Sequence, residues 1–193
     1  MQIGEEILRI YYKDSNHSMK LGNLLYSLTP RQDRPIIILS VGTDRSTGDS
    51  LGPFVGSYLK DHCKPQSIKI YGTLDEPIHA KNLHSKINYL YQRYKKPFII
   101  AVDASLGKSS SIGFITCGKG PLKPGTAINK DLPSVGDLYI TGIVNLAGFM
   151  EYAVLQSTRL SLVISMAKYI SKGISLYDQK LSLSPEPVSF ISN

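Results

Sequence analysis

Two short apolar runs, each opened by a proline and each followed by aspartate, dominate the hydrophobic pattern of the chain. The first (residues 36–41, IIILSV) leads through Gly42 into a loop that holds Asp44 and Asp49, and the second (residues 98–102, FIIAV) ends at Asp103. Short, mainly apolar runs rich in β-branched residues predict strands buried on both faces. Because ligands of α/β proteins bind at the carboxyl ends of such strands, Asp49 and Asp103 are predicted to meet at one edge of a sheet.

Helical periodicity fills the segments around these runs. Apolar residues recurring every three or four positions predict helices over residues 18–28, 51–63 and 78–94, and alternation over residues 67–72 predicts a peripheral strand. Residues 7–12 fit either a helical turn or an edge strand. The resulting order of strand, helix, strand, helix, strand predicts a parallel, doubly wound α/β sheet.

The pattern changes after Asp103. Residues 112–117 form an apolar run that follows too soon for a crossover helix, so this strand is predicted to run antiparallel to the one that ends at Asp103. A long, proline-containing loop follows over residues 118–135. The remaining pattern predicts a short strand at 137–142, one long helix from 144 to 170 ended by Gly173, and an extended tail from Leu181.

Composition describes an ordinary globular protein. A chain of 193 residues with 42% hydrophobic and 19% charged residues suits a single domain over 1–193, with its core at about 35–172 and with helix 18–28 and tail 181–193 peripheral. The net charge of +7 is spread along the chain, which favours a solvated basic face over a nucleic-acid surface. Cys63 and Cys117 lack the spacing of a disulfide framework or a zinc site, which favours two reduced thiols.

The N-terminal residues lack the order of a secretion signal. The longest uncharged apolar run, residues 138–150, is 13 residues long and is interrupted by Asn145 and two glycines, so it is too short to span a bilayer. We therefore expect a cytoplasmic protein without a membrane partner.

The loop over residues 42–52 carries the candidate chemistry. It has neither the ending of a P-loop nor the glycine spacing of a dinucleotide site. Ser46 and Ser50 flank the aspartates, but no Gly-x-Ser-x-Gly elbow occurs. Taken alone, Asp49 is explained as a helix N-cap and Asp103 as an acceptor for nearby backbone N–H groups. Side by side, they form either an acid/base pair that shares one proton or a pair of metal ligands.

A metal site is the competing use of the same oxygen atoms. Five acidic residues offer hard ligands suited to magnesium: Asp44, Asp49, Asp75, Glu76 and Asp103. Nickel or zinc would favour histidine, yet all four histidines (His17, His62, His79 and His84) precede Asp103 and are predicted to be solvated. The sequence therefore assigns no metal and no cofactor.

Three segments (SVGTD at 40–44, GDSLGP at 48–53 and AVDA at 101–104) carry a resemblance to the germination protease family of spore-forming bacteria, and more closely to its short YyaC-like sporulation relatives. The resemblance covers residues 35–170. The same layout is similar to that of hydrogenase maturation proteases, which implies a three-layer α/β/α sandwich with a mostly parallel central sheet. In those proteases the corresponding acids and a later histidine bind nickel, whereas this chain has no histidine after His84.

The resemblance implies an aspartic-type endopeptidase of sporulation, with Asp49 and Asp103 catalytic and with small acid-soluble spore proteins as the expected substrate. Four residues are expected to support the pair or to bind substrate: Asp44, Gly48, Ser50 and Ser105. Backbone N–H groups around Gly48 are expected to stabilise an oxyanion. Two alternatives remain open, namely a non-catalytic module that binds a peptide or protein and a metal-dependent hydrolase.

Overall fold

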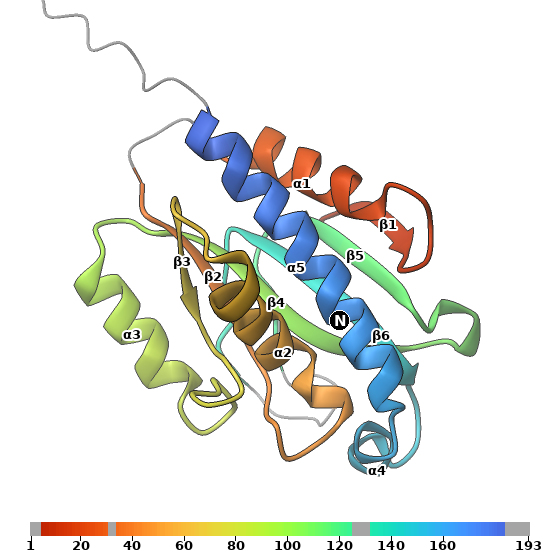
Figure 1. Ribbon diagram of the computed structural model, residues 1–193. Coiled ribbons are helices and arrows are strands. Elements are labelled where there is room, and N and C mark those ends of the chain that lie inside the picture. The colour runs from red at the N-terminus through yellow and green to blue at the C-terminus, as the bar shows by residue number, and fades with distance from the viewer. Residues whose placement is uncertain (1–4, 31–33, 125–131, 184–193) are drawn as a thin grey trace, which may run out of the picture.

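A six-stranded sheet forms the centre of the molecule, in the order β1-β5-β6-β4-β2-β3 (Figure 1). The computed structural model describes residues 5–30, 34–124 and 132–183. The strands β3, β2, β4 and β6 are parallel, and β5 runs antiparallel to its neighbours β6 and β1. The strand bounds are β1 (Glu5–Tyr11), β2 (Ile36–Ser40), β3 (Ile68–Tyr71), β4 (Phe98–Gly107), β5 (Phe114–Lys119) and β6 (Leu138–Leu146).

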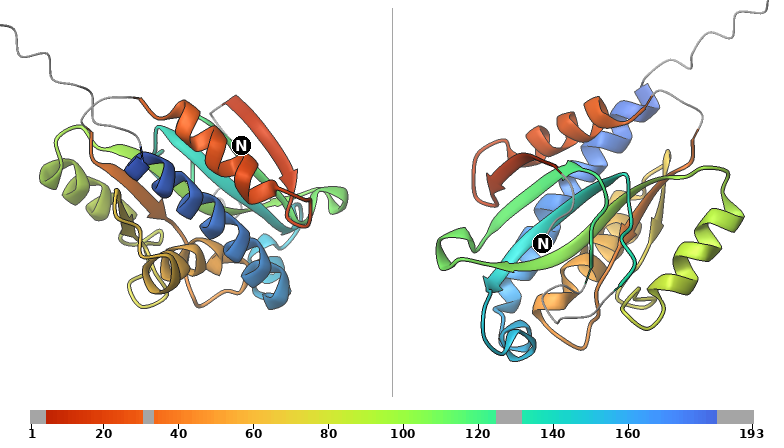
Figure 2. Two further views of the ribbon diagram at one scale, coloured as in Figure 1. Left: turned by 45° about the horizontal axis from the view of Figure 1, so that its top comes forward. Right: turned by 180° about the vertical axis from the view of Figure 1, so that it is seen from behind.

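Helices cover both faces of the sheet, which confirms the predicted α/β/α sandwich (Figure 2). One face packs on α1 (His17–Leu28), α2 (Leu51–Tyr58) and α5 (Leu160–Leu183), with the short α4 (Glu151–Gln156) at one end. The other face packs on α3 (Leu83–Arg93) and on Leu122 and Val135. Short helical turns at η1 (Gly48–Ser50), η2 (Leu59–Cys63) and η3 (Ser109–Ser111) complete the elements.

The strand order creates a crevice beside β2. The chain leaves β2 through α2 on one face to reach β3, then returns through α3 on the other face to β4, so that β3 and β4 flank β2. The parallel register pairs Ser40 with Val102. The loop after β2 and the residue Asp103 therefore lie at the point where the connections diverge, which is where open α/β sheets bind ligands.

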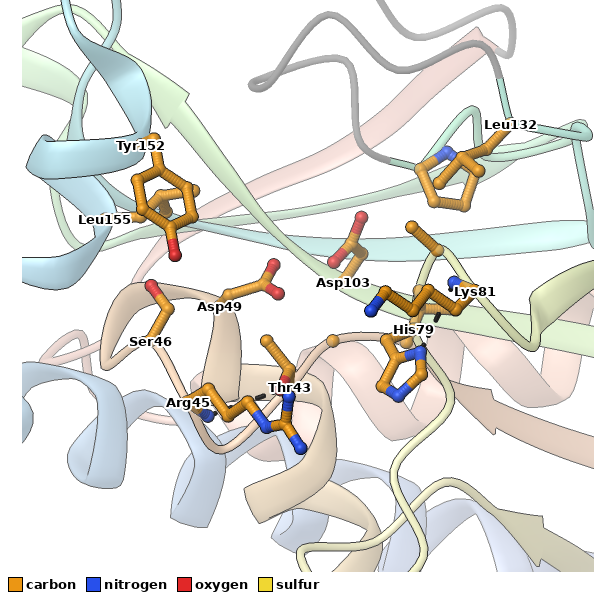
Figure 3. A pocket seen from close by; sticks show the side chains of 14 residues that line it. Thr43, Arg45, Ser46, Asp49, His79, Lys81, Asp103, Leu132, Tyr152 and Leu155 are labelled. Atoms are coloured by element: carbon orange, nitrogen blue, oxygen red, sulfur yellow. Dashed lines mark hydrogen bonds between the residues drawn. The ribbon is translucent and has the colours of Figure 1, made fainter.

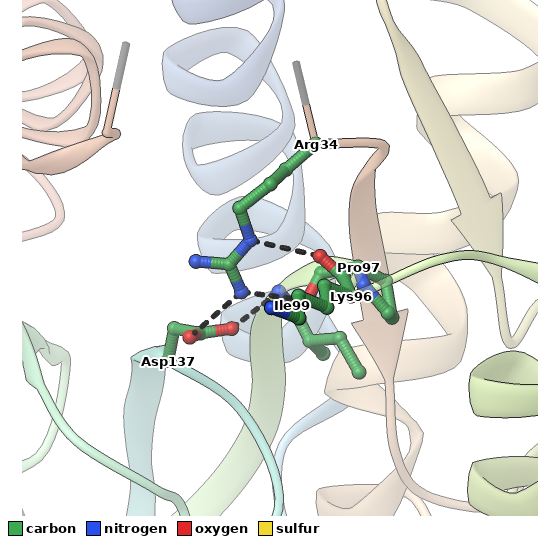
Figure 4. Close-up of polar contacts among 5 residues, drawn as sticks. All are labelled: Arg34, Lys96, Pro97, Ile99 and Asp137. Atoms are coloured by element: carbon green, nitrogen blue, oxygen red, sulfur yellow. Dashed lines mark hydrogen bonds and ion pairs between the residues drawn. The ribbon is translucent and has the colours of Figure 1, made fainter. Parts of the chain in front are cut away.

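The amino-terminal ends of the strands are held by an ion pair and its hydrogen bonds (Figure 4). The Arg34 guanidinium donates to the carbonyl oxygens of Lys96 at 2.8 Å and Pro97 at 2.9 Å. It also lies 3.2 Å from the Asp137 carboxylate, whose other oxygen accepts the Ile99 N–H at 2.8 Å. These contacts join the segments that enter β2, β4 and β6.

One predicted element is wrong: residues 144–170 do not form a single helix. The apolar run around residue 144 belongs to β6, and two helices follow it, α4 and α5. Short apolar runs do not distinguish a buried strand from a buried helix, which explains the error. Gly173 does not end the helix either, because α5 continues to Leu183. A Cβ at Gly173 would lie 2.8 Å from the Leu21 side chain, so this glycine permits the close packing of α1 against α5.

The partner predicted for residues 112–117 is also wrong. β5 pairs with β6 and β1, because β6 returns from later in the chain and occupies the place beside β4. β4 itself continues through Asp103 to Gly107, and residues 7–11 lie in the edge strand β1. The predicted tail from Leu181 begins inside α5, and its remainder lies outside the described residues, as does part of the predicted loop at 118–135. In the ranges that the structure describes, no helix is both long and apolar enough to cross a membrane.

Candidate functional site

A tightly closed loop between β2 and α2 places Asp49. Gly42 has a φ of +140°, and a Cβ added there would lie 2.0 Å from the Asp49 carbonyl oxygen. A Cβ at Gly52 would lie 2.1 Å from the Val41 carbonyl oxygen. The two glycines thus let the start of the helix pack directly on the end of the strand, and the Thr43 N–H closes the loop on the Asp49 carbonyl at 3.1 Å.

Asp103 comes from the interior of β4. It continues the row of Ile99 and Ala101, which lie in the buried layer beneath α3, and only 6% of its surface is exposed. Burial raises the pKa of the Asp103 carboxyl well above its ordinary value, and the nearby charge of Asp49 raises it further. The Ala104 N–H donates to the carboxylate at 2.8 Å and lowers the pKa by a smaller amount. On balance the Asp103 carboxyl gives up its proton less readily than an ordinary aspartate.

Asp49 and Asp103 line one cavity of about 220 Å³. Both carboxyl groups point into the same space (Figure 3), one from the loop after β2 and the other from β4. Ser46, Tyr152 and Leu155 line the cavity on the Asp49 side, and Lys81 and Leu132 line it on the Asp103 side (Figure 3). The arrangement combines two carboxyl groups, a lysine and an apolar wall in a space that fits part of a side chain or a peptide group.

The four supporting residues predicted from the sequence do not line this cavity. Asp44 is exposed and accepts a hydrogen bond from the Thr43 hydroxyl at 3.3 Å. The buried Ser50 hydroxyl donates to the Thr47 carbonyl at 2.6 Å. Gly48 packs against α4 and Ser105 is half-buried on β4. Gly48 and Ser50 belong to the loop that carries Asp49 but do not line the cavity.

Several residues that line the cavity were not predicted as site residues from the sequence. Ser46 was considered only as part of a serine-protease motif, and Tyr152 was placed inside a long helix that does not exist. His79 was predicted to be solvated, yet it is half-buried at the cavity, where its Nδ1 accepts the Lys81 N–H at 3.3 Å. His62 and His84 are exposed as predicted. No local pattern marks Tyr152 or Lys81, because each reaches the cavity only through the fold.

The cavity residues do not fit a nickel site of the kind that the resemblance to hydrogenase maturation proteases implied. Within the described residues, no three histidine, cysteine, aspartate or glutamate side chains gather closely enough to hold a metal ion. Asp75 and Glu76 lie exposed in the loop after β3, away from the cavity wall. The titratable groups at the cavity include two carboxyl groups, His79 and Lys81, which is a composition suited to proton transfer.

The fold is that of the hydrogenase maturation proteases. The crystal structure of a NiFe hydrogenase maturation protease, HycI from Thermococcus kodakarensis KOD1, superimposes with a TM-score of 0.54 at 16% sequence identity, covering 81% of this chain and 99% of that chain.

Sequence comparison identifies the family to which the chain belongs. Residues 9–173 match the family described as "Protein of unknown function (DUF1256)", and the protein belongs to this family. It is 54% identical over 153 residues to "Uncharacterized protein YyaC" from Bacillus subtilis (strain 168), covering 79% of this chain and 74% of that protein. The resemblance to YyaC-like proteins is thereby confirmed.

Proposed function

We propose that this protein is a peptidase-like hydrolase in which Asp49 and Asp103 act as an acid/base pair on a peptide bond. The observation that supports this proposal is the position of Asp103, a buried carboxyl group whose pKa is raised by burial and by a second carboxylate in the same cavity. Perturbed groups of this kind are typical of catalytic sites.

A purely structural role explains Asp103 poorly. The chain has a second buried aspartate, Asp178, whose two oxygens accept the backbone N–H groups of Gln66 at 2.9 Å and Ser67 at 2.8 Å. Such bonds satisfy both carboxylate oxygens and hold two segments together. Asp103 instead is buried beside another acid, and both its burial and that acid destabilise its charged form. That destabilisation has a function if the group works as a proton donor.

The proposed reaction needs one proton on the pair. The ionised carboxylate of Asp49 removes a proton from a water molecule, whose oxygen bonds to the peptide carbonyl carbon while the carbonyl electron pair moves onto its oxygen. As the C=O bond re-forms, the C–N bond breaks and the protonated Asp103 gives its proton to the leaving nitrogen. The products are a carboxylic acid and an amine, and transfer of the proton from Asp49 to Asp103 restores the pair.

The first substrates to test are small acid-soluble spore proteins, because the motifs that carry both aspartates resemble those of germination proteases. The purified protein is incubated with these substrates, with and without a chelator, and the products are identified by mass spectrometry. Asp49→Asn and Asp103→Asn are compared with Asp61→Asn, which changes an exposed aspartate on η2.

We expect discrete fragments from the wild type and from Asp61→Asn, and none from the two site variants. Turnover retained by either site variant contradicts the proposed mechanism. Loss of cleavage in chelator supports the alternative of a metal-dependent hydrolase.

A peptide-binding module without catalysis is the second candidate. The loop between β6 and α4 exposes 87% of Phe149 and 63% of Met150, next to Tyr152 at the cavity, and exposed apolar side chains are typical of binding surfaces. This candidate predicts saturable binding of the spore proteins without any product. Isothermal titration calorimetry on the same preparations distinguishes it from the peptidase.

A further inference from the structure

An unused hydroxyl group lies in the wall of the cavity. Ser46 is 6% exposed, and its Oγ has no hydrogen-bond partner among the described residues. The residue lines the cavity next to Asp49. A buried hydroxyl without a partner destabilises the folded protein. The position is explained if a bound molecule supplies the missing partner.

A second hydroxyl reaches the same place from another element. Tyr152 lies on α4, is 62% exposed and lines the cavity. In Figure 3 its phenol oxygen and the Ser46 hydroxyl point toward one another to one side of the Asp49 carboxyl. Two neutral O–H groups can donate hydrogen bonds to the same acceptor atom. A carbonyl oxygen next to the Asp49 carboxyl is an acceptor of this kind.

The backbone groups predicted for this role are poorly placed. Gly48 does not line the cavity, and a Cβ added to it would lie 2.7 Å from Leu155 and 2.8 Å from the Thr158 hydroxyl oxygen, so this part of the loop faces α4. The Ser50 N–H is already donated to the Thr47 carbonyl at 3.3 Å. The two side-chain hydroxyls are therefore better placed to take the role expected of the backbone.

We infer that the hydroxyl groups of Ser46 and Tyr152 together hold the carbonyl oxygen of a bound peptide. This inference rests on the proposed function, in which that oxygen gains the carbonyl electron pair when water attacks. Both hydroxyls then donate hydrogen bonds to an oxygen whose negative charge grows, and they stabilise it more in the transition state than in the bound substrate. Neither hydroxyl gains or loses a proton in the step.

Ser40 supplies a matched control. Its Oγ is also buried without a partner among the described residues, but Ser40 does not line the cavity. Ser46→Ala and Ser40→Ala thus remove the same kind of buried hydroxyl, and only the first removes it from the site. Tyr91, which is exposed on α3, provides the matched control for Tyr152→Phe.

The experiment measures kcat, KM and the thermal midpoint for the four single variants, with a small acid-soluble spore protein as the probe. We expect Ser46→Ala to lower kcat about 10²-fold or more, as the loss of one oxyanion donor does elsewhere. Tyr152→Phe should lower kcat in the same direction, and KM should change little in both. Ser46→Ala should keep or raise the thermal midpoint, as Ser40→Ala should, and both controls should keep wild-type kcat.

The outcomes separate this inference from the proposed function. Wild-type cleavage with full kcat in Ser46→Ala and Tyr152→Phe overturns the inference and leaves the peptidase standing. A lower thermal midpoint in Ser46→Ala than in Ser40→Ala also overturns it, because the hydroxyl is then structural.

If the wild type binds the probe without cleaving it, weaker binding by Ser46→Ala and Tyr152→Phe supports the carbonyl site alone. Unchanged binding overturns it, and a wild type that neither binds nor cleaves overturns both proposals.

Discussion

The two ends of the central sheet use aspartate in opposite ways. At the amino-terminal end, Asp137 pairs with Arg34 and accepts the Ile99 N–H. Its charge is therefore balanced, and its contacts join the segments that enter β2, β4 and β6. At the carboxyl end, Asp103 is more deeply buried, and the group that most affects its charge is another acid, Asp49. A balanced carboxylate supports the fold, whereas a carboxyl group destabilised as an anion is prepared to donate a proton.

Substitution of the aspartates at the two ends of the sheet should differ most in its effect on turnover. Asp103→Asn should lower the rate of peptide cleavage by at least about 10²-fold, because the amide supplies no acidic proton to the leaving nitrogen. Asp137→Asn should leave the rate per folded molecule unchanged, since the ion pair lies at the opposite end of the sheet. Steady-state kinetics on both variants measure the difference, and equal losses in the two would remove the contrast.

The free energy of unfolding should respond to the two sites in the opposite order, with the larger effect at Asp137. Asp137→Ala removes the partner of Arg34 and the acceptor of the Ile99 N–H, and we expect it to lower the free energy of unfolding by about 1–3 kcal/mol. Asp103→Asn should not destabilise the protein at neutral pH. Urea denaturation followed by circular dichroism gives both values. An Asp137→Ala variant as stable as the wild type would show that these contacts contribute nothing to the fold.

The pH dependence of stability gives a finer test. The pKa of Asp103 is raised in the folded state above its ordinary value of 3.8, so the folded protein binds the proton more tightly than the unfolded chain. Its stabilising contribution is therefore complete below about pH 3.8 and is lost as the pH rises through the raised pKa. In Asp103→Asn this loss should disappear. Parallel pH profiles of the unfolding free energy in wild type and variant would contradict the shift.

The smallest effect is expected at Asp44. It is exposed and lies outside the cavity wall, so Asp44→Ala should change the unfolding free energy by less than about 0.5 kcal/mol and leave turnover at the wild-type level. The same denaturation and kinetic assays apply. A clear fall in turnover would restore the supporting role that the sequence predicted for this residue.

Short-range patterns in the sequence were enough to predict the elements whose signals are local. The buried runs of β2 and β4, the helices around them and the strand-loop-aspartate pattern at Asp49 and Asp103 follow from short-range hydrophobic order and from the glycines that flank the loop. These features also carried the resemblance that the family match confirmed. Local order suffices there because a strand buried on both faces permits few other residue types.

The end of β6 and the surroundings of the two acids depend on contacts between distant segments, so they could not be predicted from local sequence. An apolar stretch packs equally well as strand or helix, so the division into β6, α4 and α5 depended on the open place beside β4. That division brings Tyr152 to the cavity, opposite a serine more than a hundred positions earlier in the chain. The raised pKa of Asp103 likewise comes from burial and from Asp49, and neither exists until distant segments pack together.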